Sequence, residues 1–157
     1  MLVRWMGVTD TNQAGFVHGG TVMKLCDEAA GLAAVRHTRM RVVTAGVDRM
    51  TFLERVELGD LVTFKASVNA TWRTSMEVGV RVEAERPGSG HVRHTSSAYL
   101  TMVAVDEDGR PTPIPPILTE DAQDERRERE AQTRRDNRLP EREEFRRTLE
   151  AERASHI

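Results

Sequence analysis

The hydrophobic pattern of the first third of the chain predicts one long helix. From about His18 to Thr38 the apolar residues recur at helical spacing and cover most of the circumference. They leave only a narrow polar arc with Lys24 and Glu28. The many Ala and Gly residues in this segment allow close approach of other backbone, so we expect a central helix that lies against a curved sheet.

The next seventy residues follow the two-residue period of strands. Apolar and polar side chains alternate strictly on both sides of a tight connection at Arg73 and Thr74. Shorter apolar runs add further strands, and the predicted set covers residues 2–6, 42–47, 62–72, 76–84 and 91–105. One early helix combined with consecutive strands predicts an α+β fold in which the helix covers one face of an antiparallel sheet.

The last part of the chain has a different composition, which predicts a domain over residues 1–118 and a tail over 119–157. Of the 39 residues in the tail, 22 are charged. Acid–base pairs four positions apart favour a helix, and Pro140 fits the first turn of a second helical piece. We interpret the tail as a solvated helix or a partly disordered segment; the alternative is docking on a neighbouring subunit through Phe145 and Leu149.

Charge and cysteine content exclude several classes of partner. The formal net charge is −2, and residues 1–118 hold 13 acidic and 13 basic side chains. Because no basic field is present, we expect no nucleic-acid partner and no membrane partner. Cys26 is the single cysteine, and neither a leader-like start nor a membrane-spanning apolar run is found, so we expect a cytoplasmic protein.

Two segments carry a family resemblance: DTNQAGFVHGGTVMKLCDEAAG at residues 10–31 and VDRMTFLERVELGDLV at residues 47–62. Together with the alternating strands, they resemble the hotdog-fold acyl-CoA thioesterases, especially the cytosolic acyl-CoA hydrolase branch. This resemblance implies a five-stranded antiparallel sheet wrapped around the long helix. It also implies a homodimer with a continuous sheet as the minimal unit, assembled further into a tetramer or a hexamer (a trimer of dimers).

The resemblance also implies an activity, the hydrolysis of acyl-CoA, and the residues that perform it. The catalytic Asp of the family matches Asp27, its loop Asn matches Asn12, and its Gly pair matches Gly19 and Gly20. The branch usually has a bulky apolar residue where His18 stands here. HGG is familiar from phenylacetyl-CoA-type thioesterases, which leaves the acyl or aryl group of the substrate open.

Each of these residues has a chemical role and an ordinary alternative. The backbone N–H groups of Gly19 and Gly20, at a helix start, would stabilise the developing oxyanion; otherwise the pair only eases a turn. Asp27 would be the general base toward water or a direct nucleophile, unless it merely caps a loop. Asn12 would orient water or thioester, or be a common turn residue. His18 would donate near the carbonyl or tether the loop.

The spacing of Asp27 and Gly19 predicts a site shared between subunits. Eight residues of helix separate them, which is about 12 Å along the axis. A thioester carbonyl held about 3 Å from the amide and attacked at about 3 to 3.5 Å is too far from the carboxylate of the same chain. If both groups act, Asp27 comes from the opposing subunit.

The remaining candidates concern the rest of the substrate. Arg73, Thr74 and Ser75 correspond to the region where related enzymes hold coenzyme A, although a surface hairpin explains them equally well. We expect no metal and no cofactor, because coenzyme A is itself part of the substrate. The alternatives to a thioesterase are a non-catalytic acyl-CoA-binding regulator or scaffold of the same fold, and a hydratase or dehydratase.

Overall fold

The computed structural model describes residues 1–155 and contains one five-stranded antiparallel sheet and two long helices. The elements in chain order are β1 (Leu2–Trp5), the 3-10 turn η1 (Val8–Asp10), α1 (Gly19–Thr38), β2 (Arg41–Phe52), β3 (Leu61–Thr71), β4 (Ser75–Glu85), β5 (Val92–Val105) and α2 (Ala122–Ser155). The strand order in the sheet is β1-β3-β4-β5-β2. The α+β hotdog architecture predicted from the sequence is therefore confirmed.

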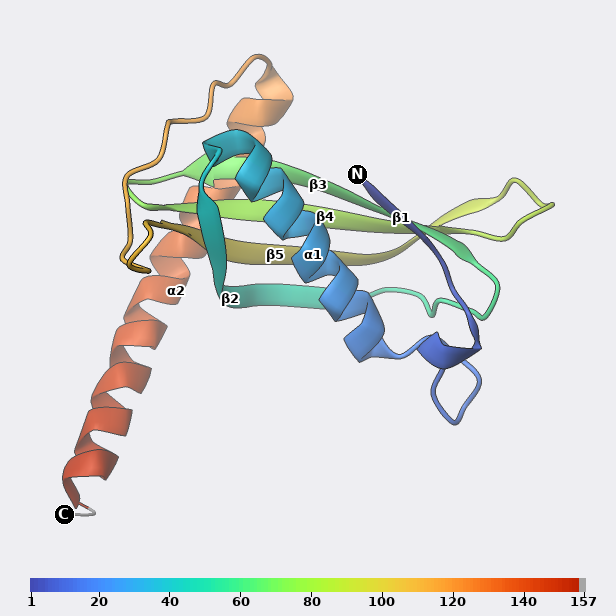
Figure 1. Cartoon of the computed structure of the whole chain (residues 1–157), viewed down its shortest axis with the longest axis horizontal. Helices are drawn as coiled ribbons and strands as arrows, with labels where there is room; N and C mark the ends of the chain where they lie inside the picture. The colour runs from blue at the N-terminus through green and yellow to red at the C-terminus, as the bar shows by residue number, and fades with distance from the viewer. Residues whose placement is uncertain (156–157) are drawn as a thin grey trace. The chain divides into compact units, whose positions relative to one another are not determined.

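Helix α1 lies across one face of the curved sheet (Figure 1). Buried side chains of the helix and the sheet form the core between them. The inward positions of β4 alternate as predicted, since Met76, Val78, Val80 and Val82 are all buried. On the helix, small residues allow the close approach, and Ala30 and Ala34 have no exposed surface. This packing fixes α1 along its length and so determines where both of its ends lie.

Strand β2 is longer than the sequence predicted and forms one edge of the sheet. It was expected over residues 42–47 but extends to Phe52, with register shifts between Thr44 and Gly46 and between Val47 and Arg49. The alternation is interrupted at these irregularities, which is why the pattern predicted a shorter strand. As a result, β2 runs beside α1 from Asp27, next to Thr44, as far as Gly19, next to Phe52.

One face of α1 is less covered than its sequence predicted. Met23, Leu32 and Val35 are more than two fifths exposed, as are Val43 and Val47 on β2. The three helix residues belong to the apolar side of α1 that we expected the sheet to wrap. The sheet of one chain therefore leaves an apolar surface along α1 and β2.

The chain forms two compact units, Met1–Leu118 and Thr119–Ile157. In the second, α2 is one helix with Pro140 in its interior, so the prediction of two helical pieces is wrong. Ion pairs such as Glu125–Arg129 and Glu143–Arg147 line its surface at four-residue spacing. Neither helix in the described part of the chain combines the length and apolarity needed to cross a bilayer.

Candidate active site

The first turn of α1 presents backbone amides at the edge of the domain. Gly19 and Gly20 are the first two helical residues, and the first N–H groups of a helix have no partner within it. His18 is the N-cap residue; its side chain makes no capping hydrogen bond, and its backbone N–H donates to the Asp10 carbonyl at 2.8 Å. A Cβ at Gly20 would meet no atom within 4 Å, so the space beside this residue is open.

The loop before α1 is held by Asn12. Its Oδ1 accepts hydrogen bonds from the backbone N–H groups of Ala14 (2.9 Å) and Phe16 (3.2 Å). This is a side-chain-closed turn, so Asn12 does have the ordinary loop role that its sequence context allowed. Its Nδ2, however, makes no hydrogen bond to any residue that the structure describes, and that donor stays available to a ligand.

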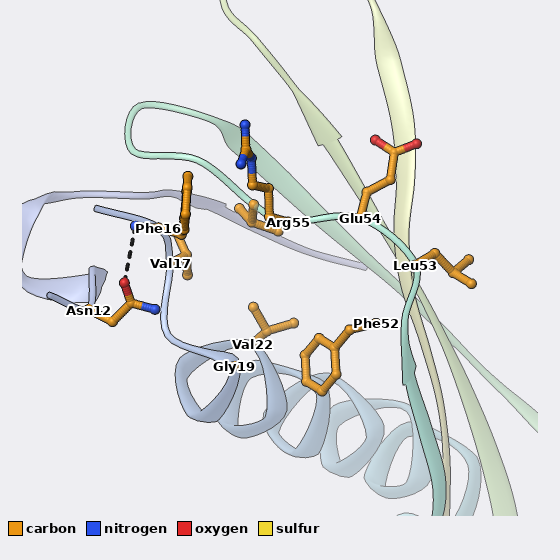
Figure 2. Close-up of a pocket in the computed structure, with 10 residues that line it drawn as sticks. Asn12, Phe16, Val17, Gly19, Val22, Phe52, Leu53, Glu54 and Arg55 are labelled. Atoms are coloured by element: carbon orange, nitrogen blue, oxygen red, sulfur yellow. Dashed lines mark hydrogen bonds between the residues drawn. The ribbon is translucent and has the colours of Figure 1, made fainter. Parts of the chain in front are cut away.

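A pocket of about 320 Å³ opens where this loop, the start of α1 and the end of β2 meet (Figure 2). Apolar side chains form most of its wall, and Asn12 and Gly19 also line it. The Phe52 ring lies against the first turn of α1, where a Cβ on Gly19 would be 3.4 Å from its Cζ. The full lining consists of Asn12, Phe16, Val17, Gly19, Val22, Phe52, Leu53, Glu54, Arg55 and Val56.

Asp27 lies farther along α1 and outside this pocket. Its carboxylate is half-buried, and Oδ1 accepts a hydrogen bond of 2.5 Å from the Thr44 hydroxyl on β2. The same hydroxyl oxygen is 3.6 Å from Met102 Sδ, so Thr44 is in contact with both the site and the core. One charge-assisted hydrogen bond orients the carboxylate while leaving its other oxygen free to accept a proton.

The structure brings some of the predicted residues together and keeps others apart. Asn12 and Gly19 line one pocket, whereas Asp27 is about two helical turns away on the same chain. Glu28, the neighbouring carboxylate, pairs instead with Lys24 at 3.8 Å on the exposed side of the helix. One chain therefore has two half-sites along β2: the first contains Asn12 and the amide of Gly19, and the second contains Asp27 and Thr44.

The hairpin that holds Arg73, Thr74 and Ser75 lies near the other end of α1. The Arg73 carbonyl accepts from Ile114 N–H at 3.0 Å, and the nearby Pro115 carbonyl contacts His37 in the last turn of α1 at 2.9 Å. The side chain of Arg73 is exposed. Within one chain, these three residues are therefore not part of the pocket at Gly19.

The remaining candidates for reactive groups are inactive in this fold. Cys26 is 1% exposed, and burial, together with the charge of Asp27, raises the pKa of its thiol to about 12. Over residues 1–155, no group of three or more His, Cys, Asp or Glu side chains is placed to hold a metal ion. The candidate groups that remain at the site are Asp27, Thr44, Asn12 and the amides of α1.

The sequence and the fold were compared with those of known proteins. Residues 14–91 match the family model of the thioesterase superfamily. A solved hexameric acyl-CoA thioesterase superposes with a TM-score of 0.86 at 37% identity, covering 89% of this chain and 90% of that one. The chain belongs to the thioesterase superfamily. The resemblance noted in the sequence is thereby confirmed.

Two further members of the thioesterase superfamily are informative. The cytosolic acyl coenzyme A thioester hydrolase of Rattus norvegicus is 35% identical over 135 residues, which are 85% of this chain. The present chain spans only 35% of the length of that relative. The acyl-CoA hydrolase of Staphylococcus aureus, solved with butyryl coenzyme A, coenzyme A and coenzyme A disulfide, has a TM-score of 0.88 at 31% identity and covers 96% of this chain and 92% of its own.

The Staphylococcus aureus hydrolase has also been solved as three single alanine variants, of one asparagine, one aspartate and one threonine. The three altered residues have the same separations in sequence as Asn12, Asp27 and Thr44 have here. Thr44 is the one of this set that sequence reasoning missed. In the sequence, Thr44 stands out only as a hydroxyl residue within an apolar strand. Its contact with Asp27 could not be predicted, because the two residues become adjacent only when β2 folds back along α1.

Proposed function

We propose that this protein is an acyl-CoA thioesterase that hydrolyses the thioester to a free acid and coenzyme A. The observation that carries the proposal is the arrangement along β2, where Thr44 holds the Asp27 carboxylate and Phe52 lies against Gly19. A base and a set of free amides at the two ends of one edge strand are the two parts that acyl transfer to water requires.

The relatives support the substrate class. The rat relative is by name an acyl coenzyme A thioester hydrolase, and the Staphylococcus aureus hydrolase was solved with butyryl coenzyme A. The latter was also solved as alanine variants of an asparagine, an aspartate and a threonine that have the spacing of Asn12, Asp27 and Thr44. The rat protein is named cytosolic, which supports our expectation that this protein is cytoplasmic.

The edge strand β2 supports a homodimer as the minimal unit. An exposed, long edge strand with apolar side chains is a template for pairing with another chain, and monomers rarely leave one open. Here Val43 and Val47 on β2 and Leu32 and Val35 on α1 are all exposed. Pairing of β2 with β2 of the partner subunit would bury this surface in a continuous sheet.

Antiparallel pairing about a twofold axis would also complete the site. If the pairing is centred near Asp48, Thr44 of one subunit lies opposite Phe52 of the partner subunit. Since Thr44 contacts Asp27 and Phe52 contacts Gly19 within each chain, Asp27 then lies beside Gly19 of the partner subunit. The two half-sites of each chain become two complete sites per dimer.

The proposed reaction proceeds at this junction. Asp27 removes a proton from water, the hydroxide attacks the thioester carbon, and the oxyanion accepts hydrogen bonds from the Gly19 and Gly20 amides of the partner subunit. Collapse breaks the carbon–sulfur bond, and the proton returns from Asp27 to the leaving thiolate. Asn12 Nδ2 is the donor that orients water or thioester. Direct attack by the carboxylate is the alternative first step.

The rest of the substrate and the assembly are extensions of the same proposal. Arg73 is exposed and Thr74 and Ser75 are half-buried, and we assign the hairpin that they form to the coenzyme A portion, which needs only polar groups outside the pocket. Hexameric relatives of this fold support a trimer of dimers for this protein as well. Water and acyl-CoA suffice for the chemistry, so the proposal includes no cofactor.

The test combines a release assay with subunit mixing. Wild type should release free thiol from acyl-CoA, whereas an acyl-CoA-binding regulator or scaffold would bind without turnover. Gly20→Val should block the amides, and Asp27→Asn should remove the base. When these two inactive chains are mixed, each heterodimer should regain one working site, because one of its junctions has both wild-type halves. Mixtures that stay inactive, with both parents folded and dimeric, would contradict the shared site.

A further inference from the structure

The pocket wall opposite α1 is made by the segment that connects β2 to β3, residues 53–60, here called the wall segment. Four of its residues line the pocket: Leu53, Glu54, Arg55 and Val56 (Figure 2). It has no regular secondary structure along most of its length, so its position depends on individual contacts. Backbone N–H groups of Leu53 and Glu54 donate to the Thr95 carbonyl at 2.8 and 3.1 Å.

One side chain outside the pocket bonds to both ends of the wall segment. Arg93 on β5 donates to Glu54 Oε2 at 3.4 Å and to the Arg55 carbonyl at 3.3 Å. Its other terminal nitrogen donates to Asp60 Oδ2 at 2.6 Å. The planar guanidinium is suited to holding several acceptors at fixed angles, which an ammonium group does not do.

Asp60 is the buried end of this arrangement. Its side chain is 0% exposed, and Oδ2 also accepts from the Glu57 backbone N–H at 2.9 Å. Oδ1 has no hydrogen bond to any described residue, and Arg86 Nε is 3.8 Å away from it. Burial raises the pKa of Asp60, an effect larger than the opposing one of Arg93. Desolvation of a buried ion pair can cancel its attraction, so the pair of Asp60 and Arg93 need not stabilise the fold. We consider it instead for the geometry that it fixes.

The wall segment also contacts the loop before α1, which forms the other side of the pocket. The Val56 carbonyl accepts from Val17 N–H at 2.9 Å, one residue before the N-cap of α1. The Arg55 guanidinium lies 4.3 Å above the centre of the Phe16 ring. A shift of the wall segment therefore moves both the loop that holds Asn12 and the side chains that a bound substrate would touch.

We propose that Arg93 is a positioning residue of this thioesterase, one that fixes the wall segment through Glu54, the Arg55 carbonyl and Asp60 so that the pocket is preformed for the acyl-CoA substrate. The inference rests on the proposed function for its substrate. Arg93 bonds to two residues that line the pocket but does not line it itself, and it makes no contact with Asp27 or Thr44. We therefore expect its main effect on substrate binding and only a small effect on kcat, because the hydrogen bond between Asp27 and Thr44 does not involve the wall segment.

The test uses Arg93→Lys in the full chain. Lysine keeps a positive charge near Asp60 but cannot reach all three acceptors at once. We expect KM for acyl-CoA to rise about tenfold, equivalent to about 1.4 kcal/mol of binding, with kcat within about threefold of wild type. Glu54→Gln, which weakens only one of the contacts, should raise KM less. The matched control is Arg81→Lys on β4, because Arg81 pairs with Glu83 at 2.7 Å and has no contact with the wall segment.

Hydrogen exchange provides a readout that does not depend on turnover. In Arg93→Lys, the amides of Leu53, Glu54 and Val17 should exchange faster than in wild type, while those in the middle of β4 stay protected. If Arg93→Lys keeps the wild-type KM and the wild-type exchange, the inference is wrong. It is also wrong if kcat falls with KM unchanged. If wild type itself releases no coenzyme A, the proposed function fails, and the exchange experiment still decides whether Arg93 holds the wall segment.

Discussion

Asp27 and Asp60 are the same residue type in opposite environments of one domain. Asp27 is half-buried beside the exposed surface of α1 and β2 and accepts one side-chain hydrogen bond, from Thr44. Asp60 is completely buried, with Arg93 and a backbone N–H on the same oxygen. The first carboxylate has a free oxygen toward solvent, whereas the second has no route to a substrate.

The difference shows that the surroundings of a carboxylate, not its residue type, determine whether it can take part in a reaction. A carboxylate that is oriented by a single hydroxyl and reachable from outside can exchange protons during a reaction. A carboxylate enclosed by cation and backbone can only hold its neighbours in place. Substitutions at the two positions should therefore separate activity from stability.

The largest expected effect is on activity, from Asp27→Asn. Loss of a general base should lower kcat by about 100- to 10,000-fold. The free energy of unfolding should change little, because the side chain is only half-buried. Steady-state release of coenzyme A and urea unfolding measure the two quantities. Glu28→Gln, at the next position on the exposed side, is the control and should keep full activity. Full turnover by Asp27→Asn would remove Asp27 from the mechanism.

The next effect is expected at Thr44, which should act only through Asp27. Thr44→Val removes a hydrogen bond to a charged group, worth about 1.5 to 3 kcal/mol, and should lower kcat by about 10- to 100-fold. Thr44→Ser keeps the hydroxyl and should stay close to wild type. In the background of Asp27→Asn, Thr44→Val should cause no comparable further loss. Equal, additive losses in both backgrounds would show that Thr44 acts independently.

A smaller effect, on the pH dependence of stability, is expected from Asp60→Asn. The pKa of Asp60 is raised by burial above its usual value of 3.8, so the folded state holds its proton more tightly than the unfolded state. The contribution of this group to stability is therefore present at low pH and is lost as pH rises through the folded pKa. Relative to Asp60→Asn, wild type should lose free energy of unfolding as the pH rises above the usual Asp pKa of 3.8. Urea unfolding at a series of pH values measures the difference, and a constant difference would contradict it.

The last prediction concerns Cys26, the neighbour of Asp27 in sequence, whose thiol should react very slowly with alkylating reagents in the folded protein. Its thiol is in the core, and its pKa is raised to about 12, first by burial and then by the charge of Asp27. At pH 8 the folded protein should resist iodoacetamide, while the same protein in urea should react quickly. Mass spectrometry measures both. Rapid labelling of the native state would show that this part of the helix opens.

Several elements could be predicted because local sequence determines them. The alternation in residues 76–84 requires one face of that strand to be buried, and the structure buries Met76, Val78, Val80 and Val82. The helix ends at Thr38 as predicted, and the next residue, Arg39, adopts a left-handed conformation with φ of 59°. Strand β2 was predicted too short, because its irregularities break the two-residue period on which the prediction depended.

The candidate site was only partly predictable for the same reason. Gly19, Gly20 and Asp27 could be named as candidates because the family resemblance assigns them, and their separation along the helix could be predicted because helix rise is a local property. Thr44 could not, since its hydrogen bond to Asp27 joins two elements that are brought together by the antiparallel return of β2 along α1. Arg93 was missed likewise, because its acceptors lie on a segment of irregular structure far away in sequence.

The sequence by itself determined the helix, most strands, the change of composition near residue 119 and the separation of Asp27 from Gly19 along the helix axis. These depend on side-chain periodicity and on helix rise, which are properties of short segments. Only the tertiary structure decided which hydroxyl orients Asp27, which wall encloses the pocket and which guanidinium holds that wall. Such contacts join distant residues, and burial and strand register, which no local pattern encodes, select them.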